Sequence, residues 1–159
     1  GQLPDSSLIA RKLGTARRIV VASPAYLERH GTPQTPDDLK DHNCLSLSKA
    51  TSLNQWEFKG PGAPRRIDVG GNFEANSGIA LHRAAVAGMG LIRAGNFTVA
   101  ADISTGRLVP VLADHELPPE TNIYAVYPHN RHLSPKVRAF VDMLVDAFLP
   151  VPPWERATD

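Results

Sequence analysis

The sequence predicts an α/β fold in which short strands alternate with helices. The run Ile19-Val20-Val21 is continuously β-branched, which is typical of a strand buried on both faces. Serine precedes proline at Ser23-Pro24 and again at Ser134-Pro135. That pair favours a helix start, because serine caps free N–H groups and proline suits the first helical position. Strand-like and helix-like segments alternate along the 159 residues, which predicts helices layered on a sheet.

The first third of the chain is expected to hold three strands and two helices. Residues 7–13 form a short strand in this prediction, residues 14–16 a weak break, and residues 18–22 a buried strand. A helix over residues 24–30 should stop at Gly31. Thr35-Pro36 repeats the helix-start pattern with acidic residues behind it, and residues 44–47 alternate like a strand.

The middle of the chain predicts a hairpin followed by a helix. Residues 56–58 and 65–73 are strand-like and flank the turn-forming residues 60–64. Asn76 and Ser77 are placed to cap a helix over residues 77–87, which should end at the glycines of 88–90. This helix is apolar nearly all round, with Ile79 and Val86 opposite its main face, so we expect it to pack on two sides.

The last third predicts two helices and three strands. Residues 91–92 form a short buried strand, residues 96–104 a helix, residues 108–112 an edge strand containing Pro110, and residues 123–127 another strand. A helix after Ser134-Pro135 has a regular apolar stripe made of Val137, Phe140, Val141, Leu144 and Phe148. Prolines at 150, 152 and 153 should end it, and residues 154–159 are expected to be a loose tail.

Composition excludes several classes of protein. Hydrophobic residues make up 42% and charged residues 21%, which favours neither a disordered chain nor a membrane protein. The formal net charge is +1, whereas a domain that binds nucleic acid by itself usually carries a large positive excess. The basic pairs Arg11-Lys12, Arg17-Arg18 and Arg65-Arg66 are scattered, so we interpret them as solvated strand ends.

No catalytic, metal or cofactor pattern is found in the sequence. Cys44 is the one cysteine and precedes an apolar run, which favours a small core residue over a reactive thiol. A single cysteine also fits a reducing compartment. The six histidines show no helical i, i+4 pair, so we expect neither a metal site nor a bound cofactor. The phosphate-loop and hydrolase serine motifs are missing, and the sequence therefore predicts a protein that is not an enzyme.

One polar helix N-terminus is the candidate binding site. Phe73 ends a strand, and Asn76, Ser77 and Gly78 lead from there into the apolar helix. Free backbone N–H groups at a helix N-terminus can hold a carboxylate or phosphate, and glycine lets a ligand approach the backbone. The alternative is that Asn76 simply caps the helix; the two roles are compatible.

The order of several segments resembles that of the sensor domains of LysR-type transcriptional regulators. These segments are residues 3–14, 18–33, 35–45, 76–91, 106–112 and 133–142, of which Arg18-Ile19-Val20-Val21-Ala22-Ser23-Pro24-Ala25-Tyr26-Leu27 is the most recognisable. The resemblance extends to about residue 149. Residues 93–96 depart from it, because the family often has Leu-Pro there. The winged helix-turn-helix of these regulators and the first half of their first lobe have no counterpart in the sequence.

This resemblance implies a fold like that of type 2 periplasmic binding proteins, with a mixed sheet flanked by helices and a ligand cleft between two lobes. Residues 1–17 would be a remnant strand of the first lobe and crossover, and residues 18–128 the second lobe. Residues 129–149 would form the crossover and closing helix of the first lobe, and residues 150–159 a flexible tail.

The resemblance also implies a function. The chain would sense a small anionic or polar effector at Phe73, Asn76, Ser77 and Gly78, and would act on DNA only through the missing helix-turn-helix. The family pairs its sensor domains, which assigns Ile79 and Val86 to a dimer interface and implies a cytoplasmic homodimer or higher homo-oligomer. The alternative is a periplasmic-type solute-binding protein of the same fold.

Overall fold

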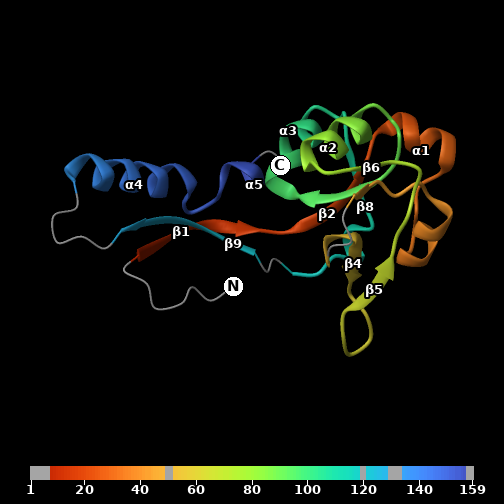
Figure 1. Ribbon diagram of the computed structural model, residues 1–159, viewed down its shortest axis with the longest axis horizontal. Coiled ribbons are helices and arrows are strands. Elements are labelled where there is room, and N and C mark those ends of the chain that lie inside the picture. Colours follow the sequence, from red (N-terminus) through yellow and green to blue (C-terminus); the bar gives the residue numbers. More distant parts are fainter. Residues whose placement is uncertain (1–7, 49–51, 119–120, 129–133, 157–159) are drawn as a thin grey trace.

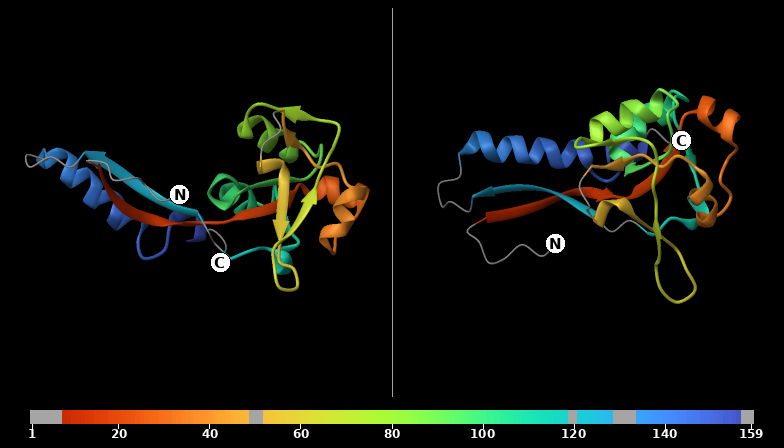
Figure 2. Two further views of the ribbon diagram at one scale, coloured as in Figure 1. Left: turned by 60° about the horizontal axis from the view of Figure 1, so that its bottom comes forward. Right: turned by 45° about the vertical axis from the view of Figure 1, so that its right-hand side comes forward.

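The computed structural model describes residues 8–48, 52–118, 121–128 and 134–156, and it has an elongated shape with two parts (Figure 1). One part, which we call the body, is compact and is made by residues 18–118. The other, which we call the arm, consists of two paired strands and one long helix that extend away from the body (Figures 1 and 2). Strand β1 (Leu8–Ala16) runs directly from the arm into β2 (Arg18–Ala22) of the body.

The centre of the body is a three-stranded antiparallel sheet in the order β7-β2-β8. Strand β2 (Arg18–Ala22) pairs with β7 (Ile92–Gly95) on one side and with β8 (Val109–Val111) on the other. The edge position predicted from Pro110 is therefore confirmed. A parallel bridge between Cys44 and Leu91 and the parallel pair β3–β6 (Ser46–Leu47 with Glu74–Ala75) add the mixed pairing that the fold class predicts.

Both faces of the central sheet are covered, as the β-branched run of β2 indicates. Ile19 and Val21 face a core shared with Leu81 and Ala85 of α2 (Gly78–Val86) and Val99 of α3 (Asn96–Ser104). Val20 and Ala22 face the opposite core. That second core includes Tyr26, Leu39, Cys44, Trp56 and Phe58.

The elements around this sheet agree closely with the sequence patterns. Helix α1 (Pro24–His30) begins at Ser23, whose side chain accepts a hydrogen bond from the Tyr26 N–H, and ends at Gly31 with φ of 80°. The hairpin β4–β5 (Gln55–Phe58 with Arg65–Asp68) is present, but its second strand ends at Asp68 and not at residue 73 as predicted. The Thr35-Pro36 signal produces the 3₁₀ helix η1 (Pro36–Asp41) and no α-helix. Two further 3₁₀ turns are η2 (Ser52–Asn54) and η3 (Ala113–His115).

The arm corrects two predictions about strands. The weak break expected at residues 14–16 is wrong, since β1 runs over Leu8–Ala16 and absorbs the irregularity as a register shift between Lys12 and Gly14. Strand β9 (Thr121–Pro128), expected in the second lobe, pairs antiparallel with β1 and lies in the arm. Alternating apolar residues show that a segment is a strand, but they do not specify its partner.

The C-terminal segment also differs from the prediction. Helix α4 (Pro135–Phe148) packs on β1 as the arm's only helix among the described residues, and it is followed by the short helix α5 (Pro153–Arg156). The expected loose tail is wrong for residues 153–156. The Trp154 ring contacts Phe97 and Phe148 edge-on at centroid distances of 6.0 and 5.5 Å, and its indole N–H donates to the Thr15 carbonyl at 3.2 Å.

Gly14 explains how this tail approaches the arm. A Cβ atom placed on Gly14 would lie 2.8 Å from Pro152 Cγ and 3.1 Å from the Trp154 ring, so a larger residue would push the tail away. The tail therefore joins the arm to α3 of the body. Within the described ranges, no helix is long and apolar enough to cross a membrane.

Candidate functional site

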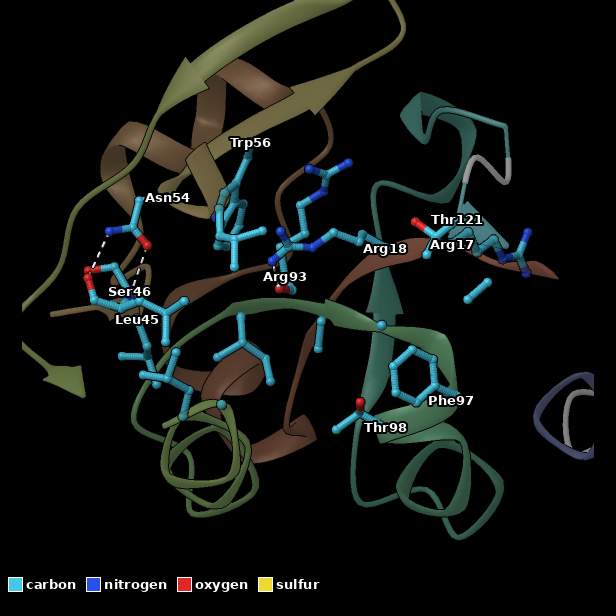
Figure 3. Close-up of a pocket in the computed structure, with 18 residues that line it drawn as sticks. Arg17, Arg18, Leu45, Ser46, Asn54, Trp56, Arg93, Phe97, Thr98 and Thr121 are labelled. Atoms are coloured by element: carbon cyan, nitrogen blue, oxygen red, sulfur yellow. Dashed lines mark hydrogen bonds between the residues drawn. The ribbon is translucent and has the colours of Figure 1, made fainter. Parts of the chain in front are cut away.

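A cleft of about 410 Å³ opens where β1 and β9 of the arm meet the body (Figure 3). The arm and the crossover contribute Ala16, Arg17 and Thr121 to its lining. The body contributes residues from β2, β3 and the residue before it, η2, β4, β7 and the first turns of α2 and α3. They are Arg18, Leu45, Ser46, Leu47, Leu53, Asn54, Trp56, Gly78, Leu81, Ile92, Arg93, Ala94, Gly95, Phe97 and Thr98.

One side of the cleft is apolar and firmly held. Leu45, Trp56, Leu81 and Ile92 are each less than a tenth exposed, so their positions are fixed by the cores beneath them. The Asn54 side chain holds the adjoining strand, because its amide donates to the Leu47 carbonyl at 2.8 Å and accepts from the Leu47 N–H at 2.9 Å. The apolar side is therefore a preformed surface.

The other side of the cleft carries arginines. Arg18 is the first residue of β2, and Figure 3 shows its side chain extending from that strand toward Arg93 and Trp56. Its guanidinium donates to the Arg93 carbonyl at 2.7 Å. Burial, and then the nearby charge of Arg93, lower the pKa of the half-buried Arg18 guanidinium from its ordinary value.

The neighbouring arginines, Arg93 and Arg17, differ from Arg18 in the contacts and direction of their side chains. Arg93 comes from β7, and its guanidinium carbon lies 5.8 Å from the centre of the Phe58 ring, a cation–π contact. Arg17 is exposed and points the opposite way, beside Thr121 (Figure 3). The interpretation of Arg17-Arg18 as a solvated strand end therefore fits Arg17 and is wrong for Arg18.

A second, more polar cavity of about 380 Å³ adjoins the first and shares its arginines. Ala16, Arg17, Arg18, Leu53, Arg93 and Thr121 line both. On its far side Arg66 donates to Glu57 at 2.6 Å. Arg18 and Arg93 thus lie between an apolar space and a polar one.

The four residues predicted for effector binding lie in different environments, and they are not all in the cleft lining. Gly78, the first residue of α2, lines the cleft. Ser77 is the N-cap, but its side chain makes no capping hydrogen bond, and Asn76 beside it is exposed. Phe73 is half-buried and packs on the core that α2 and α3 cover, outside the cleft lining.

The sequence did not identify Arg18, Trp56 or Arg93 as cleft residues. Trp56 and Arg93 lie in strands with ordinary patterns, and neither has a local signal for a site. One signal was available at Arg18, because a charged residue directly before a strand buried on both faces has little room to reach bulk water.

The two residues assigned to a dimer interface, Ile79 and Val86, differ in how exposed their side chains are. Ile79 is 65% exposed on α2, so its apolar side chain faces outward. Val86 is half-buried and packs against the body's own core. The second apolar face of α2 is therefore centred on Ile79.

Cys44 has the environment of a core residue. It is fully buried, its thiol lies 3.6 Å from the Leu39 carbonyl, and burial raises its pKa to about 12. A thiol with such a pKa is a poor nucleophile near neutral pH. Among the described residues no group of three His, Cys, Asp or Glu side chains is placed to hold a metal ion, and His129 and His132 lie outside those residues.

A sequence model of the LysR substrate binding domain matches residues 1–149. The chain belongs to this family. Members of this family are regulatory ligand-binding domains and not enzymes. Family membership therefore indicates that this chain is a regulatory domain and not an enzyme. The fold is accordingly that of a LysR-type regulatory domain, which is like that of periplasmic binding proteins.

Curated relatives are HTH-type transcriptional regulators. The chain is 37% identical over 147 residues to the HTH-type transcriptional regulator CrgA of Neisseria meningitidis serogroup B, covering 92% of this chain and 48% of the relative. It is 40% identical over 149 residues to an HTH-type transcriptional regulator of Xanthomonas campestris, covering 91% and 43%. This LysR-type domain thus spans about half the length of the curated relatives that it matches.

Solved structures agree in fold. The regulatory domain of CrgA from Neisseria meningitidis superposes with a TM-score of 0.82 at 35% identity, covering 93% of this chain and 72% of that one. The full-length virulence activator AphB of Vibrio cholerae superposes with a TM-score of 0.77 at 33% identity, covering 92% and 50%. These matches favour the regulator over the alternative of a solute-binding protein.

Proposed function

We propose that this LysR-type domain senses a small anionic or polar metabolite in the main cleft, and that in the longer protein this binding changes how an N-terminal winged helix-turn-helix holds DNA. The observation that carries the proposal is the place of the cleft, whose lining includes Ala16 and Thr121 of the arm as well as residues of the body. A ligand that contacts both parts favours one arrangement of them over others.

The N-terminus of α2 is the part of the cleft that we propose for hydrogen bonding to the effector. The first turn of a helix leaves N–H groups without intrahelical partners, and Gly78 brings this turn into the cleft lining. Ser77 and Asn76 precede it directly, and Phe73 supports the same segment from the core. Ser77 and Asn76 would serve as polar contacts at the rim.

Substitution of Gly78 tests this site. No atom lies within 4 Å of a Cβ at Gly78, so a valine there is compatible with the fold but extends into the cleft. Gly70 offers a matched control, because its Cβ position is equally free and it lies outside the cleft lining. A steric clash with the ligand of the size that overpacking produces, about 1–3 kcal/mol, corresponds to a loss of affinity of about 5- to 150-fold.

The measurement is calorimetric titration of the chain with a panel of organic acids and polar metabolites. We expect Gly78→Val to weaken the binding of any hit, Gly70→Val to leave it unchanged, and Ser77→Ala to have a smaller effect than Gly78→Val. Equal affinity in the parent and Gly78→Val proteins would place the effector elsewhere. A broad panel without any cleft-binding member would contradict the sensing function itself.

The proposal extends to the arm and to assembly. The arm would be part of a first lobe, with its exposed apolar residues, such as Phe140 and Met143, covered by residues outside this chain. Ile79 of α2, exposed by 65%, would contact a second copy in a cytoplasmic homodimer or higher homo-oligomer, with Val86 at its margin. Sedimentation equilibrium tests this contact: Ile79→Glu should weaken self-association, and an unchanged association constant would exclude Ile79 from the interface.

A further inference from the structure

The main cleft combines an apolar surface with a charged one, so a ligand that is polar throughout would match only part of it. Its apolar side, formed by Leu45, Trp56, Leu81 and Ile92, offers no charged group to a ligand. Its opposite side presents the guanidinium of Arg18, which Figure 3 shows directed across the cleft. A ligand that fills the space therefore needs an apolar body and a polar end.

Arg18 is the group that defines the polar end. Among the residues that the structure describes, no carboxylate forms an ion pair with Arg18; its interaction is the hydrogen bond to the Arg93 carbonyl. An arginine carries five N–H donors, so most of its donors stay available to a ligand. A half-buried cation without an anion is costly, and an incoming anion offsets that cost.

The surroundings of Arg18 strengthen this electrostatic preference. Arg93 supplies a second positive charge from the neighbouring strand, and the two charges act on each other closely enough to lower the Arg18 pKa along with burial. A negative charge between them would relieve this repulsion. The other arginines near the cleft have different roles, since Arg17 points away and Arg66 is paired with Glu57.

The position of the Arg18 guanidinium in the cleft also indicates which charged group the ligand carries. Arg18 is the guanidinium that reaches into the apolar cleft, and a planar carboxylate matches its fork with two parallel hydrogen bonds. A phosphate brings about −1.5 to −2 charges and three acceptor oxygens, more than this one fork satisfies. A cleft of about 410 Å³ lies toward the small end of ligand pockets, which span about 300–1,000 Å³.

We propose that the effector is a small monocarboxylate with an aromatic or branched apolar body, whose carboxylate pairs with Arg18 and whose body lies against Trp56 and Leu81. This assignment rests on the proposed function of the cleft and specifies its ligand class. It places the charged end at β2, and leaves the N-terminus of α2 to contact the remainder of the ligand.

Matched probes test the assignment with the intact chain. Phenylacetate carries both features, phenylacetamide lacks the charge, acetate lacks the apolar body, 2-phenylethylamine reverses the charge, and phenyl phosphate carries a larger head group. We expect calorimetry to give phenylacetate an affinity at least about tenfold above each of the others, because charge-assisted hydrogen bonds and buried apolar area both contribute.

Two arginine variants connect this preference to Arg18. Arg18→Gln keeps a donor for the Arg93 carbonyl but removes the charge, and should weaken phenylacetate about tenfold or more while phenylacetamide is unaffected. Arg138→Gln, on the exposed face of α4, removes the same charge far from the cleft and should change neither. Circular dichroism and thermal unfolding check that both variants fold.

Several results would overturn the ligand class while the sensing function stands. These are equal binding of acid and amide by the parent chain, tighter binding of the amine or the phosphate, unchanged phenylacetate affinity in Arg18→Gln, or cleft binding found only for uncharged members of the wider metabolite panel. Absence of cleft binding by the probes and by the entire panel would instead refute the sensing function.

Discussion

The body and the arm have similar patterns of apolar residues, but they differ in how completely these apolar side chains are buried. In the body, β2 has four of its five residues buried, and Trp56 and Phe58 are 2% and 0% exposed. In the arm, every residue of β9 is at least partly exposed, and Phe140 and Met143 of α4 are 56% and 54% exposed. Val141 is the one buried residue that α4 contributes.

This difference shows that amphipathic patterning and burial are separate properties. The apolar stripe of α4 is more regular than that of α2, yet α4 has only the two-stranded β1–β9 sheet to cover. A helix gains stability mainly from the surface on which it packs, and the arm provides little of it. The body should therefore dominate the stability of the chain, and the arm should depend on its attachments.

Truncating one phenylalanine in each part should give the largest contrast. Phe58→Ala removes a fully buried ring from the core of the body and should cost about 3–5 kcal/mol of unfolding free energy. Phe140→Ala removes a ring that is 56% exposed and should cost less than about 1 kcal/mol. Urea unfolding followed by circular dichroism measures both. Similar losses in the two variants would mean that the arm is buried in solution.

Removing the contact between the two parts should have the next largest effect. Trp154→Ala loses two edge-on aromatic contacts and the hydrogen bond to the Thr15 carbonyl, with an expected cost of about 2–3 kcal/mol. Trp154→Phe keeps a ring and should lose about 1 kcal/mol. Hydrogen exchange should show faster exchange in α5 and the adjoining end of β1. If Trp154→Ala unfolds like the parent chain, the tail does not attach the arm.

Replacing a buried carboxylate in the body and an exposed one in the arm should give a smaller difference in stability. Asp102 is 4% exposed and accepts from Arg107 at 2.7 Å, with His82 Nε2 at 2.6 Å, so Asp102→Asn should cost about 2 kcal/mol. Asp142 of the arm lies 3.8 Å from Arg11 with both side chains about half exposed, and Asp142→Asn should cost about 0.5 kcal/mol or less. Chemical unfolding at two salt concentrations distinguishes them, and equal costs would contradict the contrast.

The smallest expected effect is a pH dependence located in the body. Glu116 is buried with one carboxylate oxygen lacking a hydrogen-bond partner in the described structure, and burial raises its pKa although Arg17, Arg93 and Lys59 act to lower it. A raised folded-state pKa favours the protonated carboxyl. Its contribution to stability is therefore complete below the ordinary value of 4.5 and is lost as pH rises through the folded-state pKa.

Replacing Glu116 isolates this pH dependence. Glu116→Gln cannot ionise, so its stability relative to the parent chain should increase between pH 4 and pH 7. Urea midpoints at several pH values measure the difference. A relative stability that stays constant or falls over this range would show that Glu116 is ionised without cost in the folded body.

Local sequence signals predicted most elements well. Helices α1 and α3 have the predicted bounds, because the Ser23-Pro24 start and the glycines that follow each helix, Gly31 and Gly106 with positive φ, act within a few residues of the helix itself. The hairpin around residues 60–64 and the edge position of β8 are also local consequences of glycine and proline. The 3₁₀ form of η1 was missed, since its capping signals are shared by both kinds of helix.

The candidate site was less predictable, because it depends on contacts between residues that are far apart in the sequence. Gly78 lines the cleft as the helix-start pattern indicated, but Phe73, Asn76 and Ser77 lie outside its lining. Arg18, Trp56 and Arg93 reach the cleft from three different strands. Their proximity depends on the pairing of β2 with β7 and on how the β4–β5 hairpin packs, which involve residues more than 30 positions apart.

By itself, the sequence determined the family, the α/β class and most of the longer helices and strands, because caps, breakers and apolar periodicity act over one or two turns of chain. The tertiary structure alone decided that β9 pairs with β1, that Trp154 attaches the tail to α3, and that Arg18 points into an apolar cleft. These are long-range contacts, and they depend on the burial and electrostatics of the folded whole, which no local pattern specifies.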